Sequence, residues 1–453
     1  MSEILGSVLI ANRGEIALRV IRACKELGIR SVLAYSEADA DSLPVRLADE
    51  TVCIGPAQAR LSYQNQQALI SAAKSFKVDA IHPGYGFLAE NPDFAKYCET
   101  ENINFVGPAS EIIRKMGDKI EARKIAKAAG VSTIPGSDGE VSDIQTAMKI
   151  ADEVGFPLLI KASAGGGGRG MRVVHERASL EKDLTEIMAE AEAAFGNPAV
   201  YIERYLTDIR HIEVQVISDG VKTLHTGERD CTAQRRNQKL VEEAPSPVLT
   251  EAIRERMYQA AIRLCEAVKY KNAGTIEFVF DNVSREFYFI EMNTRIQVEH
   301  PVSEMVTGID LIKLQLLIAS GIPLELEQSD IQIRGHAIEC RINAEDPKQN
   351  FMPSPGRVEY FRAAGGFGVR MDSHIESGYL IPPYYDSMVG KLICWGNDRE
   401  EAIARMLRAL KETEVVGIKT TADLHHFLLS HPAFQSGEIN TAFVAKVLES
   451  GEF

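Results

Sequence analysis

Hydrophobic and polar positions repeat with two different periods in the N-terminal quarter of the chain. Apolar runs at residues 8–11 and 31–36 fit buried strands. Between them, the apolar positions of residues 16–27 recur at helical spacing, and Gly28 stands where a left-handed residue often ends a helix. A second unit of helix and strand follows near residues 65–81. These patterns predict an open α/β sheet, in which the loops after the carboxyl ends of the strands bind ligands.

The rest of the chain alternates between the same two periods and predicts a multidomain protein of the α/β and α+β classes. Between residues 131–139 and 203–206 a segment is expected to form a small lid, and the stretch from 332 to 394 is rich in β-formers. The other expected elements are helices at 109–130 (two), 250–268, 309–320, 398–411 and 421–429, and strands at 211–217, 274–280 and 286–293.

Composition narrows the class of protein. The chain has 453 residues, enough for two to four compact units. Its formal net charge of −14 argues against nucleic acid or an anionic membrane as the main partner. The seven cysteines are scattered without a Cys-x-x-Cys, which is typical of reduced thiols and not of disulfides or zinc. No apolar run approaches the ~20 residues of a membrane span, so a cytoplasmic location is expected.

A run of glycines marks the first candidate site. Residues 161–174 read KASAGGGGRGMRVV, with apolar β-formers on both sides. A dinucleotide loop would be followed by a helix, but MRVV predicts a strand. The pattern therefore predicts a hairpin whose backbone N–H groups cover nucleotide phosphates. The alternative is a mobile surface hairpin, and Lys161 at the end of the strand favours the phosphate lid.

A row of alternating polar residues marks the second site. Glu291, Asn293, Arg295, Gln297 and Glu299 recur at every second position. If the segment is extended, all five side chains project from one face. A solvated strand face is the alternative explanation, although an exposed face seldom places an amide and a guanidinium between carboxylates in this order.

A third carboxylate belongs with this row. Glu277 lies in the otherwise apolar strand GTIEFVF, and a short hairpin would place that strand beside Glu291 and Asn293. Such an oxygen cluster suits one or two Mg²⁺ ions, which bind nucleotide phosphates through carboxylates. Lid, lysines and metal cluster together indicate cleavage of ATP.

The segment ERDCTAQRRNQK (228–239) is basic in an acidic protein. Its charges fit a solvated loop, and they fit a site for a small anion equally well. Spacing alone does not decide between the two.

Across nearly the whole chain, the motifs resemble the biotin carboxylase component of biotin-dependent carboxylases, an ATP-grasp enzyme. The motifs are IANRGEIALRVIRACKELGI, HPGYGFLAEN, MGDK, KASAGGGGRGMR, ERDCTAQRRNQK, EEAP, IEMNTRIQVEHPV, GHAIECRINAEDP and PPYYDSMVGKLI. The resemblance implies a Rossmann-like N-terminal domain (1–117), an ATP-grasp domain (118–334) with a lid at about 134–206, and a β-rich C-terminal domain (335–453).

The resemblance also implies roles for single residues. The residues expected to bind ATP are Lys119, Lys161, Gly165, Gly166, Gly167, Gly168, Glu203, Arg204, Leu206, His211, Gln234 and Asn237. Metal ligands would be Glu277, Glu291 and Asn293, and bicarbonate would be held by Lys239, Arg295, Gln297 and Val298. Glu299 falls on the general base, Arg341 on the group that steadies the biotin enolate, and Tyr85 on a biotin contact.

In the chemistry that this resemblance implies, bicarbonate attacks the γ-phosphorus of ATP with Mg²⁺ or Mn²⁺ present, and the product carboxyphosphate releases CO₂ that carboxylates biotin. The expected partners are a separate biotin carboxyl carrier protein, a carboxyltransferase subunit and a second copy of the chain in a homodimer. The final carboxyl acceptor, whether an acyl-CoA, pyruvate, 2-oxoglutarate or urea, is chosen by a partner.

Two details of the sequence need separate interpretation. One departs from the family pattern, and the other looks like a biotin-accepting motif. Many relatives carry histidine where Asn237 stands, and we interpret this position as a binding contact. Residues 147–150 read AMKI, like the biotin-accepting AMKM, but they lie in a helical pattern, so we expect Lys149 to remain unmodified. The alternative functions are another ATP-grasp ligase that joins a carboxylate to an amine, and a non-catalytic regulatory paralogue.

Overall fold

The computed structural model describes residues 3–162, 171–195 and 198–453. Its chain divides into two compact units. The first unit contains residues 1–131, 210–279 and 290–453, and the second contains 132–209 and 280–289.

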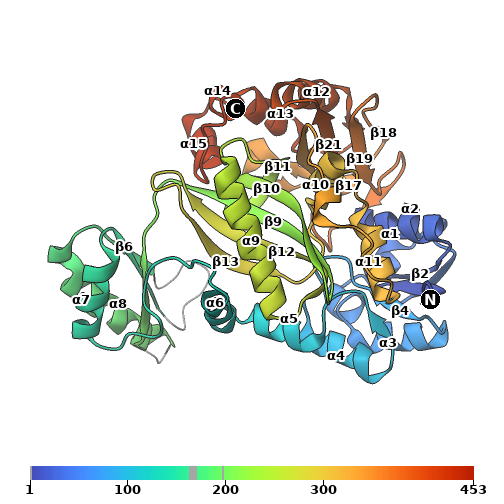
Figure 1. The fold of residues 1–453 in the computed structure, drawn as a ribbon. Coiled ribbons are helices and arrows are strands. Elements are labelled where there is room, and N and C mark those ends of the chain that lie inside the picture. Colours follow the sequence, from blue (N-terminus) through green and yellow to red (C-terminus); the bar gives the residue numbers. More distant parts are fainter. Residues whose placement is uncertain (1–2, 163–170, 196–197) are drawn as a thin grey trace. The chain divides into compact units, whose positions relative to one another are not determined.

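The first unit begins with the predicted open α/β sheet (Figure 1). Its five strands are parallel and run in the order β3-β2-β1-β4-β5. The strands are β1 (Ser7–Ile10), β2 (Arg30–Tyr35), β3 (Glu50–Cys53), β4 (Ala80–His82) and β5 (Asn104–Phe105). Helix α1 (Gly14–Leu27) ends at Gly28, whose φ of 70° is left-handed, as the sequence predicts.

An eight-stranded sheet forms the centre of the first unit. Its order is β13-β12-β9-β10-β11-β14-β21-β19, and each neighbouring pair from β9 to β19 is antiparallel. The strands are β9 (Ile209–Asp219), β10 (Thr223–Arg235), β11 (Gln238–Ala244), β12 (Lys271–Asp281), β13 (Phe287–Asn293), β14 (His336–Asn343), β19 (Val369–Ser373) and β21 (Met388–Gly396). The ends of β9, β12 and β13 extend into the second unit.

Helices cover this sheet. Helix α9 (Glu251–Ala267) packs on β10, and α12 (Arg399–Glu412) packs on β21 (Figure 1). A core of buried apolar side chains, among them Ile338, Leu392 and Met406, joins β14, β21 and α12. The other helices of this unit are α2 (Leu43–Leu47), α3 (Gln66–Ser75), α4 (Pro92–Thr100), α5 (Ser110–Gly117), α6 (Lys119–Ala128), α10 (His300–Thr307), α11 (Leu311–Ala319), α13 (Ala422–Ser430), α14 (Pro432–Gln435) and α15 (Phe443–Ser450). Its short strands are β15 (Glu345–Asp346), β16 (Met352–Pro353), β17 (Gly356–Arg357), β18 (Tyr360–Arg362), β20 (Leu380–Ile381) and β22 (Glu414–Val416).

The second unit is built on the predicted hairpin. Strand β6 (Leu158–Ala162) pairs antiparallel with β7 (Met171–Val174) and with β8 (Val200–Arg204). Helices α7 (Ile144–Val154) and α8 (Arg177–Phe195) pack together and against these strands. The candidate phosphate-binding glycines, Gly165 to Gly168, lie outside the described residues. Lys149 lies on α7, as the helical pattern around AMKI predicts.

The cysteines agree with the prediction from composition. All seven cysteines lie within the described residues; none forms a disulfide, and six are buried. Among the helices of the described chain, none combines the length and apolar character needed to span a bilayer.

Candidate active site

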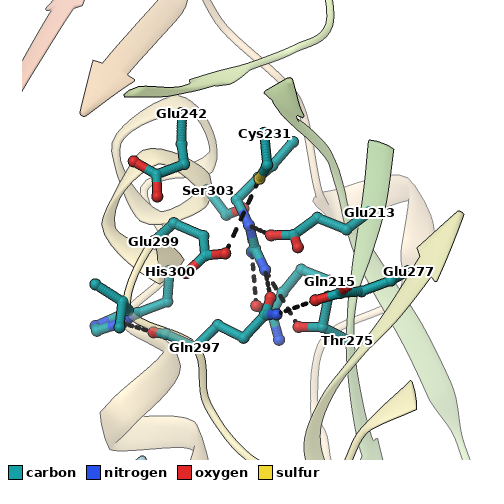
Figure 2. Close-up of polar contacts among 12 residues, drawn as sticks. Glu213, Gln215, Cys231, Glu242, Thr275, Glu277, Gln297, Glu299, His300 and Ser303 are labelled. Carbon is teal, nitrogen blue, oxygen red and sulfur yellow. Dashed lines mark hydrogen bonds and ion pairs between the residues drawn. The ribbon is translucent and has the colours of Figure 1, made fainter. Parts of the chain in front are cut away.

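A buried arginine organises the centre of the eight-stranded sheet. Arg229 on β10 is fully buried, and its five N–H groups all donate hydrogen bonds. The acceptors are labelled in Figure 2: Glu213, Gln215, Thr275, Gln297 and Ser303. The shortest run to Glu213 Oε1 (2.5 Å), Gln297 Oε1 (2.6 Å) and Gln215 Oε1 (2.7 Å). With every donor used, Arg229 fixes its neighbours in place and has no group left for a small anion. Residues 228–234 of this segment lie in a buried strand and not in a solvated loop, whereas residues 236–238 are exposed at its end.

Lys239 on β11 binds three carboxylates at once. Its Nζ lies 2.6 Å from Glu213 Oε2, 2.6 Å from Glu299 Oε1 and 3.1 Å from Glu277 Oε1. Burial would lower the pKa of Lys239, but Glu213 and Glu299 outweigh burial and raise the pKa well above its ordinary value. The cluster therefore holds a permanent cation between the predicted base and a predicted metal ligand.

Glu299 lies between two cations. Besides Lys239, Arg341 Nη2 lies 3.0 Å from Glu299 Oε2. Burial would raise the pKa of the Glu299 carboxyl, but Lys239 and Arg341 outweigh burial and hold the pKa well below its ordinary range. The side chain is 2% exposed, so this is an ionised carboxylate in a site shielded from water.

Arg341 on β14 also binds a second carboxylate, Glu242 on β11, at 2.5 Å. Burial raises the pKa of Glu242 to about 7, against the opposing effect of Arg341. Its Oε2 has no hydrogen-bond partner among the described residues. Arg341 thus presents one guanidinium to two carboxylates of different acidity.

The extended row predicted for residues 291–299 is wrong beyond Asn293. Strand β13 ends there, the chain turns, and Glu299 is the N-cap residue of α10. Pro301 near the start of α10 accounts for the helix that begins at His300, because proline favours the first turn of a helix. The polar side chains still converge: Gln297 donates to Glu277 (2.7 Å).

Two other predicted bicarbonate contacts, Arg295 and Val298, lie in the same segment. Arg295 donates to Asn293 Oδ1 (3.0 Å) and pairs with Glu90 (2.9 Å), which sequence reasoning missed. Val298 lies half-buried in the turn before α10, and its carbonyl accepts a hydrogen bond from Lys391 (2.7 Å).

The three predicted metal ligands lie on adjacent strands, β12 and β13. Asn293 donates to Glu277 Oε1 (2.8 Å), while Glu291 pairs with Lys119 (3.6 Å). A cavity of about 300 Å³ is lined by Lys119, Glu291 and Asn293 among others. Burial opposes ionisation of Glu277, but Lys239 and His211 outweigh it and lower its pKa. Ionised carboxylate and amide oxygens are the donors that Mg²⁺ prefers, so the set fits that ion.

The predicted nucleotide contacts fall into both units. In the second unit, Lys161 on β6 pairs with Glu203 on β8 (2.5 Å), Arg204 is exposed and Leu206 is half-buried. In the first unit, His211 lies on β9 with Nε2 2.9 Å from Glu277 Oε2, and Gln234 is buried on β10.

Asn237 occupies a tight turn. Arg235 on β10 pairs with Gln238 on β11, which leaves Arg236 and Asn237 as a two-residue loop. Their φ values are 50° and 64°, the left-handed conformation at both central positions of a type I′ hairpin. Asparagine is one of the few side chains that adopt it readily, so the backbone itself favours this residue.

Tyr85 lies at a cavity of about 250 Å³ whose lining includes Arg13, Tyr385 and Asp386. Its hydroxyl donates to Glu15 Oε1. The predicted biotin contacts Tyr85 and Arg341 therefore both bind buried acidic side chains.

Comparison with known proteins agrees with this architecture. Three family models match: "Biotin carboxylase, N-terminal domain" at residues 4–113, "Carbamoyl-phosphate synthase L chain, ATP binding domain" at 118–327, and "Biotin carboxylase C-terminal domain" at 339–446. The biotin carboxylase of Pseudomonas aeruginosa is 56% identical over 98% of this chain and 99% of its own length.

Solved structures match over the same length. The biotin carboxylase domain of a thermophilic 2-oxoglutarate carboxylase bound to bicarbonate is 44% identical, with a TM-score of 0.94 over all of both chains. The corresponding domain dimer of Hydrogenobacter thermophilus, in complex with MgADP, ADP and bicarbonate, is 46% identical, with a TM-score of 0.88 over 100% of this chain and 99% of that one. The chain belongs to the biotin carboxylase family, an ATP-grasp ligase family. The predicted family and fold class are confirmed.

Proposed function

We propose that the protein carboxylates biotin on a separate carrier protein, using ATP and bicarbonate and passing through carboxyphosphate. The observation that carries this proposal is the buried cluster in which Lys239 and Arg341 both bind Glu299, beside the carboxylate of Glu277. A proton acceptor between two cations, next to oxygen ligands for Mg²⁺, has the groups needed to bind and deprotonate a small anion. Family membership supports the same reaction.

Glu299 acts first in this scheme. Bicarbonate, as an anion, competes with Glu299 for Lys239 and Arg341, and the position of Arg295, Gln297 and Val298 in the adjoining turn supports their role as further contacts. Once the cations turn to bicarbonate, they no longer hold the Glu299 pKa down, so the carboxylate becomes a stronger base and takes the proton of bicarbonate. The resulting oxyanion attacks the γ-phosphorus and releases ADP.

The nucleotide side of the site supplies charge and position. Lys119, Lys161, Glu203, Arg204, Leu206, His211, Gln234 and Asn237 are the proposed ATP contacts, together with the glycine loop. Glu277, Glu291 and Asn293 would hold Mg²⁺, which when bound neutralises charge on the phosphates. Positioning of the reactants supplies most of the remaining rate.

Arg341 acts in the second half of the reaction. Carboxyphosphate yields CO₂ and phosphate, and the phosphate takes the proton of the biotin ureido nitrogen. Arg341 then stabilises the negative charge that develops on the ureido oxygen, because a guanidinium already fixed by Glu242 does not have to reorganise. Tyr85 would be a further contact to the biotin.

Further proposals concern organisation. We propose the domain boundaries 1–117, 118–334 and 335–453, a cytoplasmic location, and a homodimer that works with a biotin carboxyl carrier protein and a carboxyltransferase subunit. The dimer of the Hydrogenobacter thermophilus domain supports the homodimer. The helical setting of Lys149 on α7 supports a carrier that is another chain.

The test is ATP cleavage by the purified chain. ADP release should require Mg²⁺ and bicarbonate and should rise with free biotin. The control omits bicarbonate while keeping the other components. ATP turnover that is indifferent to biotin would favour an ATP-grasp ligase of another kind, and AMP as the product would refute both.

A further inference from the structure

Lys391 on β21 is a fully buried cation that the proposed reaction does not use. Its side chain is 0% exposed, and its Nζ lies 2.7 Å from the carbonyl oxygen of Val298 and 3.1 Å from Glu15 Oε1. Burying an ammonium is costly unless it is paired and hydrogen-bonded, and even a paired buried charge is poor support for stability. This lysine therefore calls for an explanation beyond holding the fold together.

The sheet register places Lys391 beside the predicted biotin site. Lys391 on β21 is directly opposite Arg341 on β14. Directly opposite residues of an antiparallel pair share one face, so the two side chains leave the sheet on the same side. Arg341 extends to Glu299 and Glu242, whereas Lys391 extends to Val298 and Glu15.

The two partners of Lys391 lead to two different proposed substrates. Val298 lies in the turn that contains the bicarbonate contacts, between Gln297 and Glu299. Glu15, at the start of α1, is 3% exposed and accepts a hydrogen bond from the hydroxyl of Tyr85, the proposed biotin contact. A continuous chain of contacts thus runs from Tyr85 through Glu15 and Lys391 to the backbone of Val298.

We propose that Glu15 and Lys391 are positioning residues that set the bicarbonate-binding turn and the biotin-contacting Tyr85 relative to each other. This inference rests on the proposed function for the roles of Val298 and Tyr85. Lys391 holds the Val298 carbonyl, and through it the turn that carries Glu299. Glu15 holds the Tyr85 hydroxyl, and the ion pair joins the two.

The charge state of Glu15 connects Lys391 with the Tyr85 hydroxyl. Burial raises the pKa of the Glu15 carboxyl, and Lys391 opposes that rise. Loss of Lys391 therefore favours protonated Glu15, which is a weaker acceptor for the Tyr85 hydroxyl. One substitution at Lys391 should disturb both substrate positions.

The experiment compares steady-state kinetics and thermal stability for Lys391→Met, for the double variant Glu15→Gln/Lys391→Met, and for a control. In the control, Arg399→Met, the substitution removes a partner of the buried Glu243 (2.6 Å), which lies on the opposite face of the sheet from Glu242. KM is measured separately for ATP, bicarbonate and free biotin. Tyr85→Phe removes only the hydroxyl that donates to Glu15, and so it tests the biotin side of the contact chain by itself.

For Lys391→Met we expect the KM values for bicarbonate and biotin each to rise about tenfold, equivalent to ~1.4 kcal/mol, with KM for ATP within about twofold. Tyr85→Phe should raise KM for biotin alone. Arg399→Met should lower the melting temperature and leave all three KM values near wild type. The double variant removes both members of the Lys391–Glu15 ion pair, so its melting temperature should recover while KM for bicarbonate stays raised.

Recovery of both KM values along with stability in the double variant would show a purely structural pair and overturn the proposal. Unchanged KM values in Lys391→Met would do the same. If Lys391→Met does not fold, the double variant decides alone. A wild-type chain without bicarbonate-dependent ATP cleavage would instead refute the proposed function, and the positioning roles with it.

Discussion

Replacing Lys239 with methionine is the sharpest test of the carboxylate cluster. Methionine keeps most of the volume and removes the charge, which leaves Glu213, Glu277 and Glu299 without the ammonium that lies within 3.1 Å of each. The expected result is a loss of stability that depends on pH. It follows from the geometry and does not require that the protein be an enzyme.

The size of the effect follows from burial. The Lys239 side chain is 12% exposed, and removing one partner of a buried ion pair costs about 3–5 kcal/mol. Unfolding entropy is about 2.1 cal/mol/K per residue, or roughly 1 kcal/mol/K for 453 residues. The melting temperature should therefore fall by about 3–5 °C at pH 8.

The direction of the pH dependence is fixed by the carboxylates. In the wild-type protein Lys239 helps to hold the pKa values of Glu277 and Glu299 below their ordinary range, so these groups contribute stability above that range and lose it only as the pH falls through their lowered pKa values. In Lys239→Met both pKa values rise, and protonation relieves the repulsion as the pH falls. The difference in melting temperature should therefore be largest at pH 8 and shrink at pH 5.

The assay is thermal unfolding of both proteins across this pH range, without nucleotide or Mg²⁺. Lys411→Met, at an exposed lysine on α12, is the matched control and should follow the wild type at every pH. An equal difference at pH 8 and pH 5, or a difference below about 1 °C at pH 8, would mean that the three carboxylates do not depend on Lys239.

The remaining predictions concern the reaction and the hairpin turn. Glu299→Gln should reduce bicarbonate-dependent ADP release by about 10² to 10⁴, the usual effect of losing a general base. Arg341→Ser should spare much of the ADP release while carboxybiotin falls by about 10² to 10³; equal loss of both products there, with ADP release intact in Glu299→Gln, would reverse the assignment. Asn237→His should keep ADP release within about tenfold, because histidine also tolerates positive φ and still donates a hydrogen bond. Asn237→Val should lower the melting temperature, and an unchanged value would contradict the strain expected of a β-branched residue at a φ of 64°.

Local pattern predicted the elements whose neighbours in sequence decide their structure. The first strand, helix and strand were found because one face of α1 is continuously apolar and Gly28 ends it. For residues 228–239, which include the end of β10, the sequence did not decide between a solvated loop and an anion site, because the charges fit both. Arg229 is buried there only because Glu213, Gln215, Thr275, Gln297 and Ser303 surround it, and these residues come from three other parts of the chain.

In the candidate site, too, local motifs could be recognised from the sequence, whereas long-range contacts could not. The resemblance supplied Lys239, Glu299 and Arg341, but Glu213, Glu242 and Glu90 were missed because their roles depend on long-range contacts with those residues. The extended row failed beyond Asn293. Pro301 indicates a helix start near residue 300 from the sequence alone, but the turn at 294–298 has no such local signal.

The three separate stretches of chain in the first unit determine the order in which the protein can fold during synthesis. Most of the second unit, residues 132–209, is contiguous and leaves the ribosome early. The eight-stranded sheet lacks β21 until residue 396 has been made, about 10–40 s later at ordinary elongation rates of ~5–20 residues per second. Until then β14 has an unpaired edge and half of its core is missing, and such edges recruit other chains. The wait for β21 is therefore a step at which a nascent chain is exposed to aggregation.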